Sequence, residues 1–138
     1  MQSRKEKYGY LLILEQGEEV KSAISEWAKK QGIKGAQVLG IGAITGVELA
    51  YYAPRARKWK TRRFSGKSYE LISCIGNISD EGLHAHVSMS DSSFKVHGGH
   101  LLSAKISVFG EFYVLLTAAL RKKLVPKLGL KGISLEMP

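Results

Sequence analysis

Histidine is the residue type whose spacing in this chain most clearly suggests chemistry. All four histidines of the 138 residues fall within a 17-residue segment, as His84, His86, His97 and His100. In a β-strand, alternate side chains project from the same face, so His84 and His86 are expected to lie side by side, about 7 Å apart at Cα. Two imidazoles placed in this way can bind one ion.

A third imidazole can reach this pair from a neighbouring strand. Gly98 and Gly99 precede His100, and glycine permits backbone conformations that a larger residue would forbid. Three neutral imidazoles with an open position suit a catalytic or ligand-accepting Zn²⁺, although nickel, copper or iron can bind the same set. We therefore predict a zinc site formed by His84, His86 and His100. The alternative is that these are ordinary solvent-facing histidines of a strand. His97 would point to the opposite face and ranks below the other three.

Two glutamates are candidates for a ligand or a proton-transfer group beside such a site. Glu111 is a lone carboxylate in the apolar segment 108–116, and strict alternation places it on the same strand face as Phe109 and Tyr113. It is a candidate fourth ligand, general acid or base, or simply the ion-pair partner of a lysine. The same three interpretations apply to Glu70, which begins the apolar segment 70–75.

Positive charge is concentrated in two runs without acidic residues. The chain has 21 Lys and Arg against 12 Asp and Glu, a net charge of +9. The first run also contains Trp59 and Phe64, and a mixture of cations and rings can bind phosphate and stack on a base. The alternative is a solvated edge strand whose charges prevent aggregation. The nucleic-acid-binding candidates are Arg55, Arg57, Lys58, Lys60, Arg62 and Arg63, in a run that ends at Lys67; the second run holds Arg121, Lys122, Lys123, Lys127 and Lys131.

The hydrophobic pattern predicts a single α+β domain over residues 1–138. Apolar residues recur at helical spacing between Val20 and Gln31, with Trp27 in the buried stripe and Gly32 placed to cap the helix. Beyond Gly32 the period changes to two, which predicts a largely antiparallel sheet flanked by one long helix, with a second, short helix as an open alternative. The predicted strands are 8–14, 36–41, 47–53, 59–64, 69–75, 83–89, 105–116 and 133–136.

The glycine motif that joins the predicted strands 36–41 and 47–53 does not indicate nucleotide binding. Gly40, Gly42 and Gly46 resemble a dinucleotide fingerprint, but their spacing is GxGxxxG and a strand follows instead of the required helix. Close strand packing or a β-bulge explains these glycines better.

Several protein classes are excluded by the composition. The longest apolar stretch, 108–120, is interrupted by Glu111 and is shorter than the roughly 20 residues that a membrane span needs. The N-terminal region lacks the apolar core of a signal peptide. Cys74 is the single cysteine, so an internal disulfide and a cysteine-based zinc site are both excluded, and we expect it to be a small buried residue. These features predict a soluble cytoplasmic protein with no membrane partner.

The order of the motifs resembles the PPC family (plants and prokaryotes conserved domain, also called DUF296). The similarity extends over roughly residues 7–135, and it is the order of the motifs, rather than any one of them, that is specific. The motifs are Gly40-Ile41-Gly42-Ala43, the segment from Tyr69 to Ser79, His84-Ala85-His86 followed by Val87 to Asp91, and Gly98-Gly99-His100-Leu101-Leu102.

The resemblance implies a compact domain that assembles as a homotrimer, with a metal site at His84, His86 and His100. Plant members carry an AT-hook, an Arg-Gly-Arg motif for A·T-rich DNA, ahead of this domain. Here Pro54-Arg55-Ala56-Arg57 lacks the central glycine, so that mode of DNA binding does not carry over. A remoter, fold-level similarity links the family to acetolactate decarboxylase, a zinc enzyme, and fold alone does not establish chemistry.

Two functions follow as hypotheses. The first is a homotrimeric regulatory module that retains a histidine-bound metal and associates with DNA or with a DNA-binding protein. The second is a zinc-dependent lyase or hydrolase of small molecules, in which Glu111 or Glu70 moves the proton. A purely structural metal is a third possibility.

Overall fold

The computed structural model describes residues 1–135 and contains eight strands and one helix within them. No helix in this part of the chain is long and apolar enough to cross a membrane. The elements are β1 (Gln2–Glu6), β2 (Gly9–Glu15), α1 (Val20–Lys30), β3 (Ala36–Ala53), β4 (Lys58–Ser79), β5 (Gly82–Ser90), β6 (Val96–Leu116), β7 (Arg121–Val125) and β8 (Leu130–Ser134).

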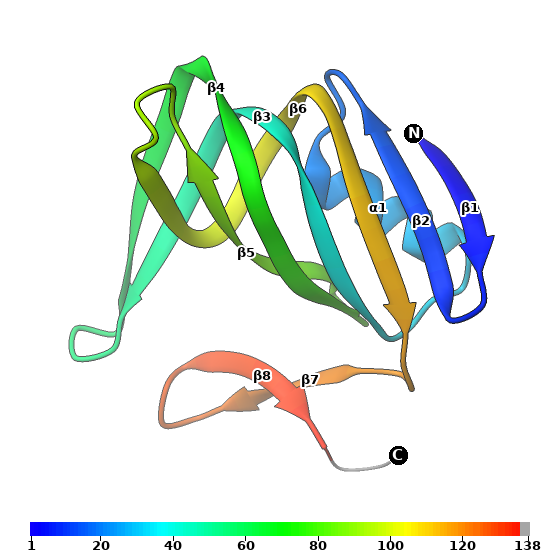
Figure 1. Cartoon of the computed structure of the whole chain (residues 1–138). Helices are drawn as coiled ribbons and strands as arrows, with labels where there is room; N and C mark the ends of the chain where they lie inside the picture. The colour runs from blue at the N-terminus through cyan, green and yellow to red at the C-terminus, as the bar shows by residue number, and fades with distance from the viewer. Residues whose placement is uncertain (136–138) are drawn as a thin grey trace.

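The sheet closes on itself between β5 and β6. The six-stranded sheet has the order β1-β2-β6-β3-β4-β5. A further pairing of β5 with β6 closes strands β6, β3, β4 and β5 into a ring. All strand pairs are antiparallel, as predicted. Strand β6 is long enough to pair with β5 through residues 96–100 and with β2 through residues 109–115. The β7–β8 hairpin forms a separate small sheet below the ring (Figure 1).

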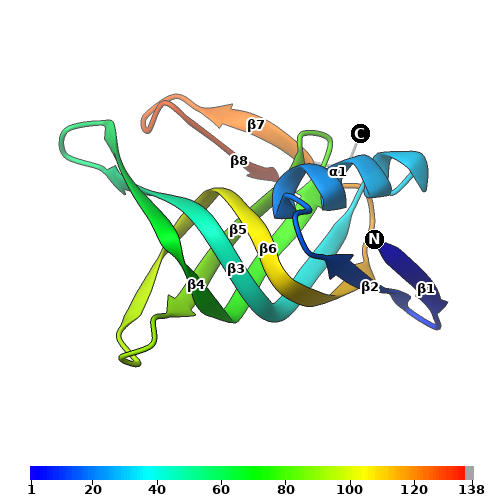
Figure 2. The same ribbon diagram turned by 90° about the horizontal axis from the view of Figure 1, so that it is seen from above.

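Helix α1 supplies one side of the core. Its buried residues, Val20, Ile24, Trp27 and Ala28, form the predicted apolar stripe, and Trp27 is a core residue as expected. Glu19 caps the helix by accepting a hydrogen bond from the Ser22 backbone N–H at 2.7 Å. The helix lies beside β2 and β6 when the ring is seen from above (Figure 2). The rest of the core consists of alternate residues of the strands, which point into the ring, among them the buried Cys74.

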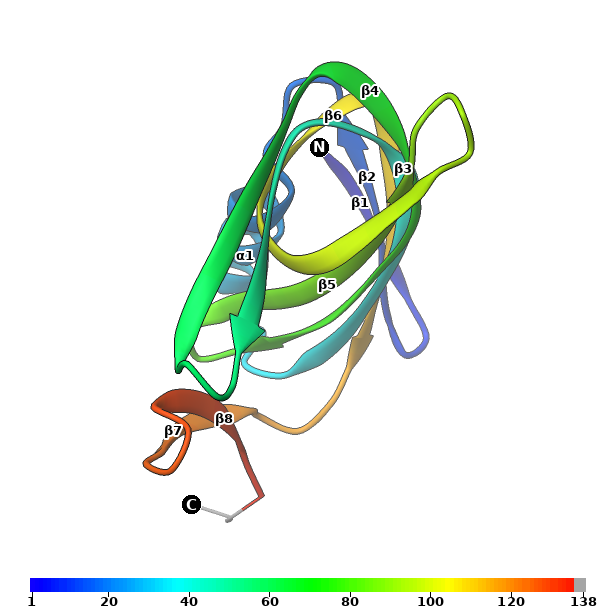
Figure 3. The same cartoon turned by 90° about the vertical axis from the view of Figure 1, so that its left-hand side faces the viewer.

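The strands are longer than the sequence pattern predicted, because glycines bend them without ending them. Segments 36–41 and 47–53 are both parts of β3, and segments 59–64 and 69–75 are both parts of β4. The β3–β4 register shifts between Gly40 and Gly42 and again between Thr45 and Val47. Such bulges increase the local bend of a strand, so β3 and β4 curve around the core (Figure 3).

Other elements also differ from the prediction. The second, short helix is absent from residues 1–135, and β6 begins at Val96 instead of at 105. Strand β1 was not predicted because all its residues are exposed and show no apolar alternation. Strand β7 corresponds to the second basic run, for which the sequence predicts no strand. Strand β8 covers 130–134, so the predicted strand 133–136 is displaced toward the C-terminus, and its last residue lies outside the described part.

Gly40 is required by close packing, in agreement with the interpretation of the glycine motif. Its β3 position pairs with Phe112 of β6, whose side chain is fully buried. A Cβ placed on Gly40 would lie 2.1 Å from the Phe112 ring, far inside van der Waals contact. The motif therefore lets a strand pass over an aromatic ring, and no helix follows it.

We predict that Gly40→Ala lowers the free energy of unfolding by about 1–3 kcal/mol, because the added methyl group has to displace the Phe112 ring within a packed core. Urea denaturation followed by circular dichroism measures the change. Gly132→Ala is the matched control, because a Cβ there would meet no atom closer than 3.7 Å. Equal stabilities for the two variants would contradict this explanation of the motif.

Candidate metal centre and nucleic-acid interface

Three of the four histidines meet where β5 pairs with β6. His86 and His100 are opposite each other in the register, and His84 lies two residues before His86 on the same face of β5. Gly98 and Gly99 leave space on the two sides of β6: a Cβ on Gly98 would lie 2.9 Å from the Val87 carbonyl oxygen of β5, and one on Gly99 3.0 Å from the Ala50 carbonyl oxygen of β3. The glycines therefore matter for close approach between strands and not for the special backbone conformations predicted from the sequence; neither has a φ in the left-handed region.

The imidazole nitrogens of this histidine cluster are close enough to share an ion. One nitrogen from each of His84, His86 and His100 lies within 4.8 Å of the others. His84 Nε2 and His100 Nδ1 are 3.2 Å apart and share a hydrogen bond. Two nitrogens each about 2.05 Å from a tetrahedral Zn²⁺ are about 3.3 Å apart, so this pair already has the required spacing. The donor set fits a divalent transition metal with a coordination position left open.

The surroundings keep His84 and His100 neutral. Burial is the main reason that the pKa values of His84 and His100 are lowered, that of His100 to about 4. The positive charges of Lys21 and Lys122 act in the same direction. At neutral pH both rings therefore present free lone pairs, which is the form that binds a metal.

His97 lies on the other face, as predicted from its spacing. Its ring packs against Phe64 and Tyr69, at centroid distances of 5.1 and 6.4 Å, and its Nε2 is 3.6 Å from Asp91 Oδ2. Backbone N–H groups of Ser93 and Lys95 donate to Asp91 and lower the pKa of its carboxyl. His97 thus belongs to a small polar and aromatic cluster at the rim of the core.

The two glutamate candidates lie away from the histidine cluster along the sheet. Glu111 is exposed, and it pairs with Ile13 of β2 and Ile41 of β3. Phe109 and Tyr113 flank it on the same face and are also about half exposed, at 51% and 53%. Alternation therefore placed Glu111 correctly, although its apolar neighbours do not bury it. Glu70, also exposed, pairs with Ser90 at the far end of β5.

The six basic candidates of the first run lie on the β3–β4 hairpin, which protrudes from the ring (Figure 1). All six side chains are exposed, and Trp59 between them is 46% exposed. Phe64 is not available for stacking, because it is buried and packs under the Arg62 guanidinium. We call the segment from Tyr51 to Arg63 the basic hairpin.

Trp59 connects the basic hairpin with the histidine cluster. Its ring centroid is 5.1 Å from that of His100, and on the other side 5.2 Å from that of Tyr52. The Tyr52 hydroxyl donates a hydrogen bond of 2.7 Å to the Leu128 carbonyl, in the loop between β7 and β8. The sequence pattern places Trp59 in the basic run but contains no signal for this contact, which depends on how the two hairpins curve.

A shallow depression of about 360 Å³ borders the histidine cluster. His84 and His86 form one wall, and Ile133 of β8 and Leu120 form another. Asn77, which faces His84 in the register, also lines it, and its side-chain oxygen is buried without a hydrogen-bond partner. Asn77 lies within the motif from Tyr69 to Ser79, but its type alone did not mark it as a site residue.

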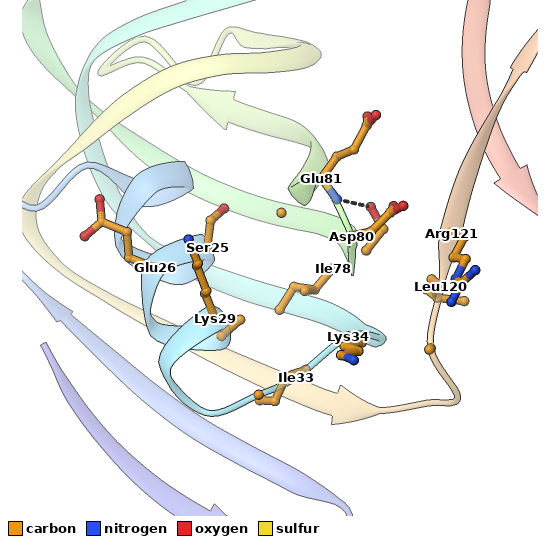
Figure 4. Close-up of a pocket in the computed structure, with 15 residues that line it drawn as sticks. Ser25, Glu26, Lys29, Ile33, Lys34, Ile78, Asp80, Glu81, Leu120 and Arg121 are labelled. Carbon is orange, nitrogen blue, oxygen red and sulfur yellow. Dashed lines mark hydrogen bonds between the residues drawn. The ribbon is translucent and has the colours of Figure 1, made fainter.

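A larger depression, of about 790 Å³, lies between the end of α1 and the β4–β5 turn (Figure 4). Its rim mixes both signs of charge, with Glu26 and Lys29 on the helix side and Asp80 and Arg121 on the other side, while Ile78 lies between them. It lacks the histidines, and we assign it no chemistry.

Comparison with known proteins agrees with this geometry. The model of the Plants and Prokaryotes Conserved domain matches residues 1–119. A plant- and prokaryote-conserved protein from Pyrococcus horikoshii is 30% identical, with 99% of this chain and 96% of that chain covered and a TM-score of 0.81. No curated protein sequence matches significantly.

Two further solved structures bear on the site. A proposed DNA-binding protein from Bacteroides thetaiotaomicron is 28% identical over 96% of both chains, with a TM-score of 0.90. A metal-containing protein from Archaeoglobus fulgidus is 26% identical, over 97% of this chain and 99% of that chain, with a TM-score of 0.82. The family model covers most of the chain, and the chain belongs to the Plants and Prokaryotes Conserved domain family.

Proposed function

We propose that this protein is a regulatory module that binds DNA through the basic hairpin. The observation that carries the proposal is the protruding hairpin itself, on which all six candidate cations, from Arg55 to Arg63, are exposed. The DNA-binding role proposed for the protein from Bacteroides thetaiotaomicron supports it. A DNA-binding protein, instead of DNA, is the other partner that this surface fits.

The shape of the hairpin suits duplex DNA. Beyond Ala50, the last β3 residue that pairs with β6, β3 and β4 continue as a two-stranded antiparallel ribbon from the Tyr51–Lys60 pair to the Ala53–Lys58 pair, with Arg55 and Arg57 in its turn. A two-stranded β-ribbon fits the major groove, which is about 12 Å wide. There the side chains of both faces can approach the phosphates that border the groove, while Trp59 offers a ring for an unstacked base.

We predict salt-dependent binding of a 20-base-pair duplex, measured by fluorescence anisotropy between 50 and 200 mM salt. Each phosphate contact contributes about −0.9 to the slope of log K against log salt concentration. Replacing both Arg55 and Lys58 by Ala should therefore reduce the magnitude of the slope by about 2. Lys5→Ala, on the exposed β1, is the control and should leave the slope unchanged.

Absence of binding at 50 mM salt, or an affinity that does not vary with salt, would contradict DNA binding. An equal change of slope for Lys5→Ala would contradict the assignment to the basic hairpin.

We also propose that the histidine cluster holds one divalent transition metal per chain, with Zn²⁺ as the first candidate. His84, His86 and His100 would be the ligands, and when bound the metal would supply a Lewis-acid centre with one open position. Support comes from the spacing of the nitrogens, the neutral rings and the metal-containing relative from Archaeoglobus fulgidus.

Removing a ligand should abolish stoichiometric metal binding. We predict one Zn²⁺ per chain by calorimetry, and a loss of affinity of more than about 100-fold for His84→Ala, His86→Ala or His100→Ala, since loss of a mere supporting residue costs 10–100-fold. His97→Gln is the matched control on the opposite face and should bind Zn²⁺ normally. Normal binding by all three alanine variants would disprove the site.

The exposed face of the sheet supports the proposed homotrimer. Ile41, Ile75 and Tyr113 are each exposed by 53% on that face, and a large apolar surface of this kind commonly marks a protein contact. We predict a mass near three times 15.2 kDa by sedimentation equilibrium, because burial of this surface stabilises the assembly. A mass of one chain at micromolar concentration would contradict it.

A cytoplasmic location is part of the same proposal and agrees with the single free, buried Cys74.

A zinc-dependent small-molecule enzyme is the second candidate, and the depression beside the histidine cluster favours it. There the buried Asn77 oxygen would hold a donor group of a substrate, such as a hydroxyl, and the roles of Glu111 and Glu70 as proton carriers remain proposals. The variants above separate the two functions. Turnover would depend on His84 and be indifferent to Arg55 and Lys58, whereas direct DNA binding depends on Arg55 and Lys58.

A further inference from the structure

Trp59 belongs to two sites at once. It lies in the basic hairpin between Lys58 and Lys60, and its ring packs on the ring of His100 at a centroid distance of 5.1 Å and an interplanar angle of 44°. Since Trp59 is still 46% exposed, the contact with His100 covers one part of the indole and leaves another part open to solvent. A change in the position or charge of the His100 ring therefore alters a direct contact of Trp59, a residue of the proposed DNA-binding surface.

The contacts continue into the second basic run. Trp59 packs on Tyr52, its partner in the β3–β4 register, and Tyr52 is hydrogen-bonded to the Leu128 carbonyl. Leu128 follows Lys127 in the β7–β8 loop. The two hairpins approach each other at this point when the molecule is seen from its side (Figure 3). His100, Trp59, Tyr52 and Leu128 thus form one continuous set of contacts.

Metal binding would change the contacts of His100, the first residue of this set. Without metal, His84 Nε2 and His100 Nδ1 share one hydrogen, so only one of them has a free lone pair. A shared ion would need both lone pairs, so the hydrogen would have to reside on the other nitrogen of its own ring, and both His84 Nε2 and His100 Nδ1 would be free to hold the ion. His86, whose ring centroid is 5.4 Å from both others, has to approach as well.

A metal-bound imidazole also attracts an indole more strongly. The ring carries part of the charge of the ion, and the face of tryptophan is the best aromatic partner for a cation. The contact between His100 and Trp59 is therefore more favourable with metal than without it. Because Trp59 lies one residue pair from the turn of the hairpin, a stronger contact would restrict the hairpin and reduce the entropy lost when DNA binds.

We propose that metal binding at the histidine cluster increases the affinity of the basic hairpin for DNA through the contact between His100 and Trp59. This inference rests on both proposed sites and adds their coupling. By linkage, DNA raises the affinity for the metal by the same factor. Trp59 is a positioning residue in this account, and it does not bind the ion.

The contact can be measured by fluorescence. The chain has two tryptophans, and Trp27→Phe leaves Trp59 as the sole tryptophan, which can be excited selectively in the presence of the six tyrosines. Trp27 is buried and packs against Tyr10, so phenylalanine keeps an aromatic ring in its place. In this variant, addition of Zn²⁺ should change the emission of Trp59 and saturate at one ion per chain. In a variant that also carries His100→Ala, the change should disappear.

The coupling itself is measured as the ratio of DNA affinity with saturating Zn²⁺ to that with EDTA, at about 0.15 M salt. We expect a ratio of about 5–10 for the unchanged protein, at the lower end of typical coupling between sites. Trp59→Ala should reduce the ratio to about 2 or less while one Zn²⁺ still binds. Tyr51→Ala, which removes another exposed ring of the same hairpin, should keep the full ratio.

The ratio of the two DNA affinities is used because Trp59→Ala also removes any stacking of Trp59 on a base. That loss lowers the affinity both with Zn²⁺ and with EDTA, so it cancels in the ratio. An equal ratio in the unchanged protein and in Trp59→Ala would overturn the coupling and leave the two proposed sites intact. Unchanged Trp59 emission during stoichiometric Zn²⁺ binding would overturn it independently of any loss of stability in the alanine variant. A complete lack of DNA binding, with or without Zn²⁺, would instead overturn the proposed function.

Discussion

The structure depends on the pairing of β5 with β6 that closes the ring. Two adjacent glycines make room here, because a Cβ on Gly98 would crowd the Val87 carbonyl of β5 and one on Gly99 would crowd the Ala50 carbonyl of β3 on the other side of β6. A shift of one residue would turn His100 into the core, since alternate residues of a strand face opposite sides. The correct register instead sets His100 opposite His86. Beyond this point β6 leaves β5, and the start of α1 fills the space, with the Glu19 carboxylate accepting a hydrogen bond from the Ala104 N–H.

Features that depend on local sequence could be predicted, whereas features that depend on how the strands curve and close into the ring could not. The histidine cluster was predictable, because HxH spacing and two glycines before a third histidine are local features. Helix α1 was predictable from its apolar stripe, and the glycine motif from its wrong spacing. The lengths of β3 and β4 were not, because a glycine that bends a strand has the same local appearance as one that ends it. Strand β1 has no buried face, so its pairing with β2 left no pattern to detect.

Contacts between distant segments were also beyond the sequence. Trp59 and His100 are separated by 41 positions, and their contact exists only because the β3–β4 hairpin curves over the end of the β5–β6 pair. The approach of Lys122 to the histidine cluster likewise depends on the position of the β7–β8 hairpin. The net charge of +9 indicated a partner for phosphate, but it gave no reason to connect the two basic runs with a metal site. In the folded chain both runs border the histidines.

The central claim is that three imidazoles of this chain bind one metal ion. The most direct measurement is a crystal structure of the protein prepared with Zn²⁺, with anomalous diffraction recorded at the zinc edge. The account predicts one anomalous peak per chain at about 2.0–2.1 Å from a nitrogen of His84, His86 and His100, with the hydrogen bond between His84 and His100 replaced. An empty cluster in fully Zn²⁺-saturated crystals, or a peak bound to other residues alone, would contradict it.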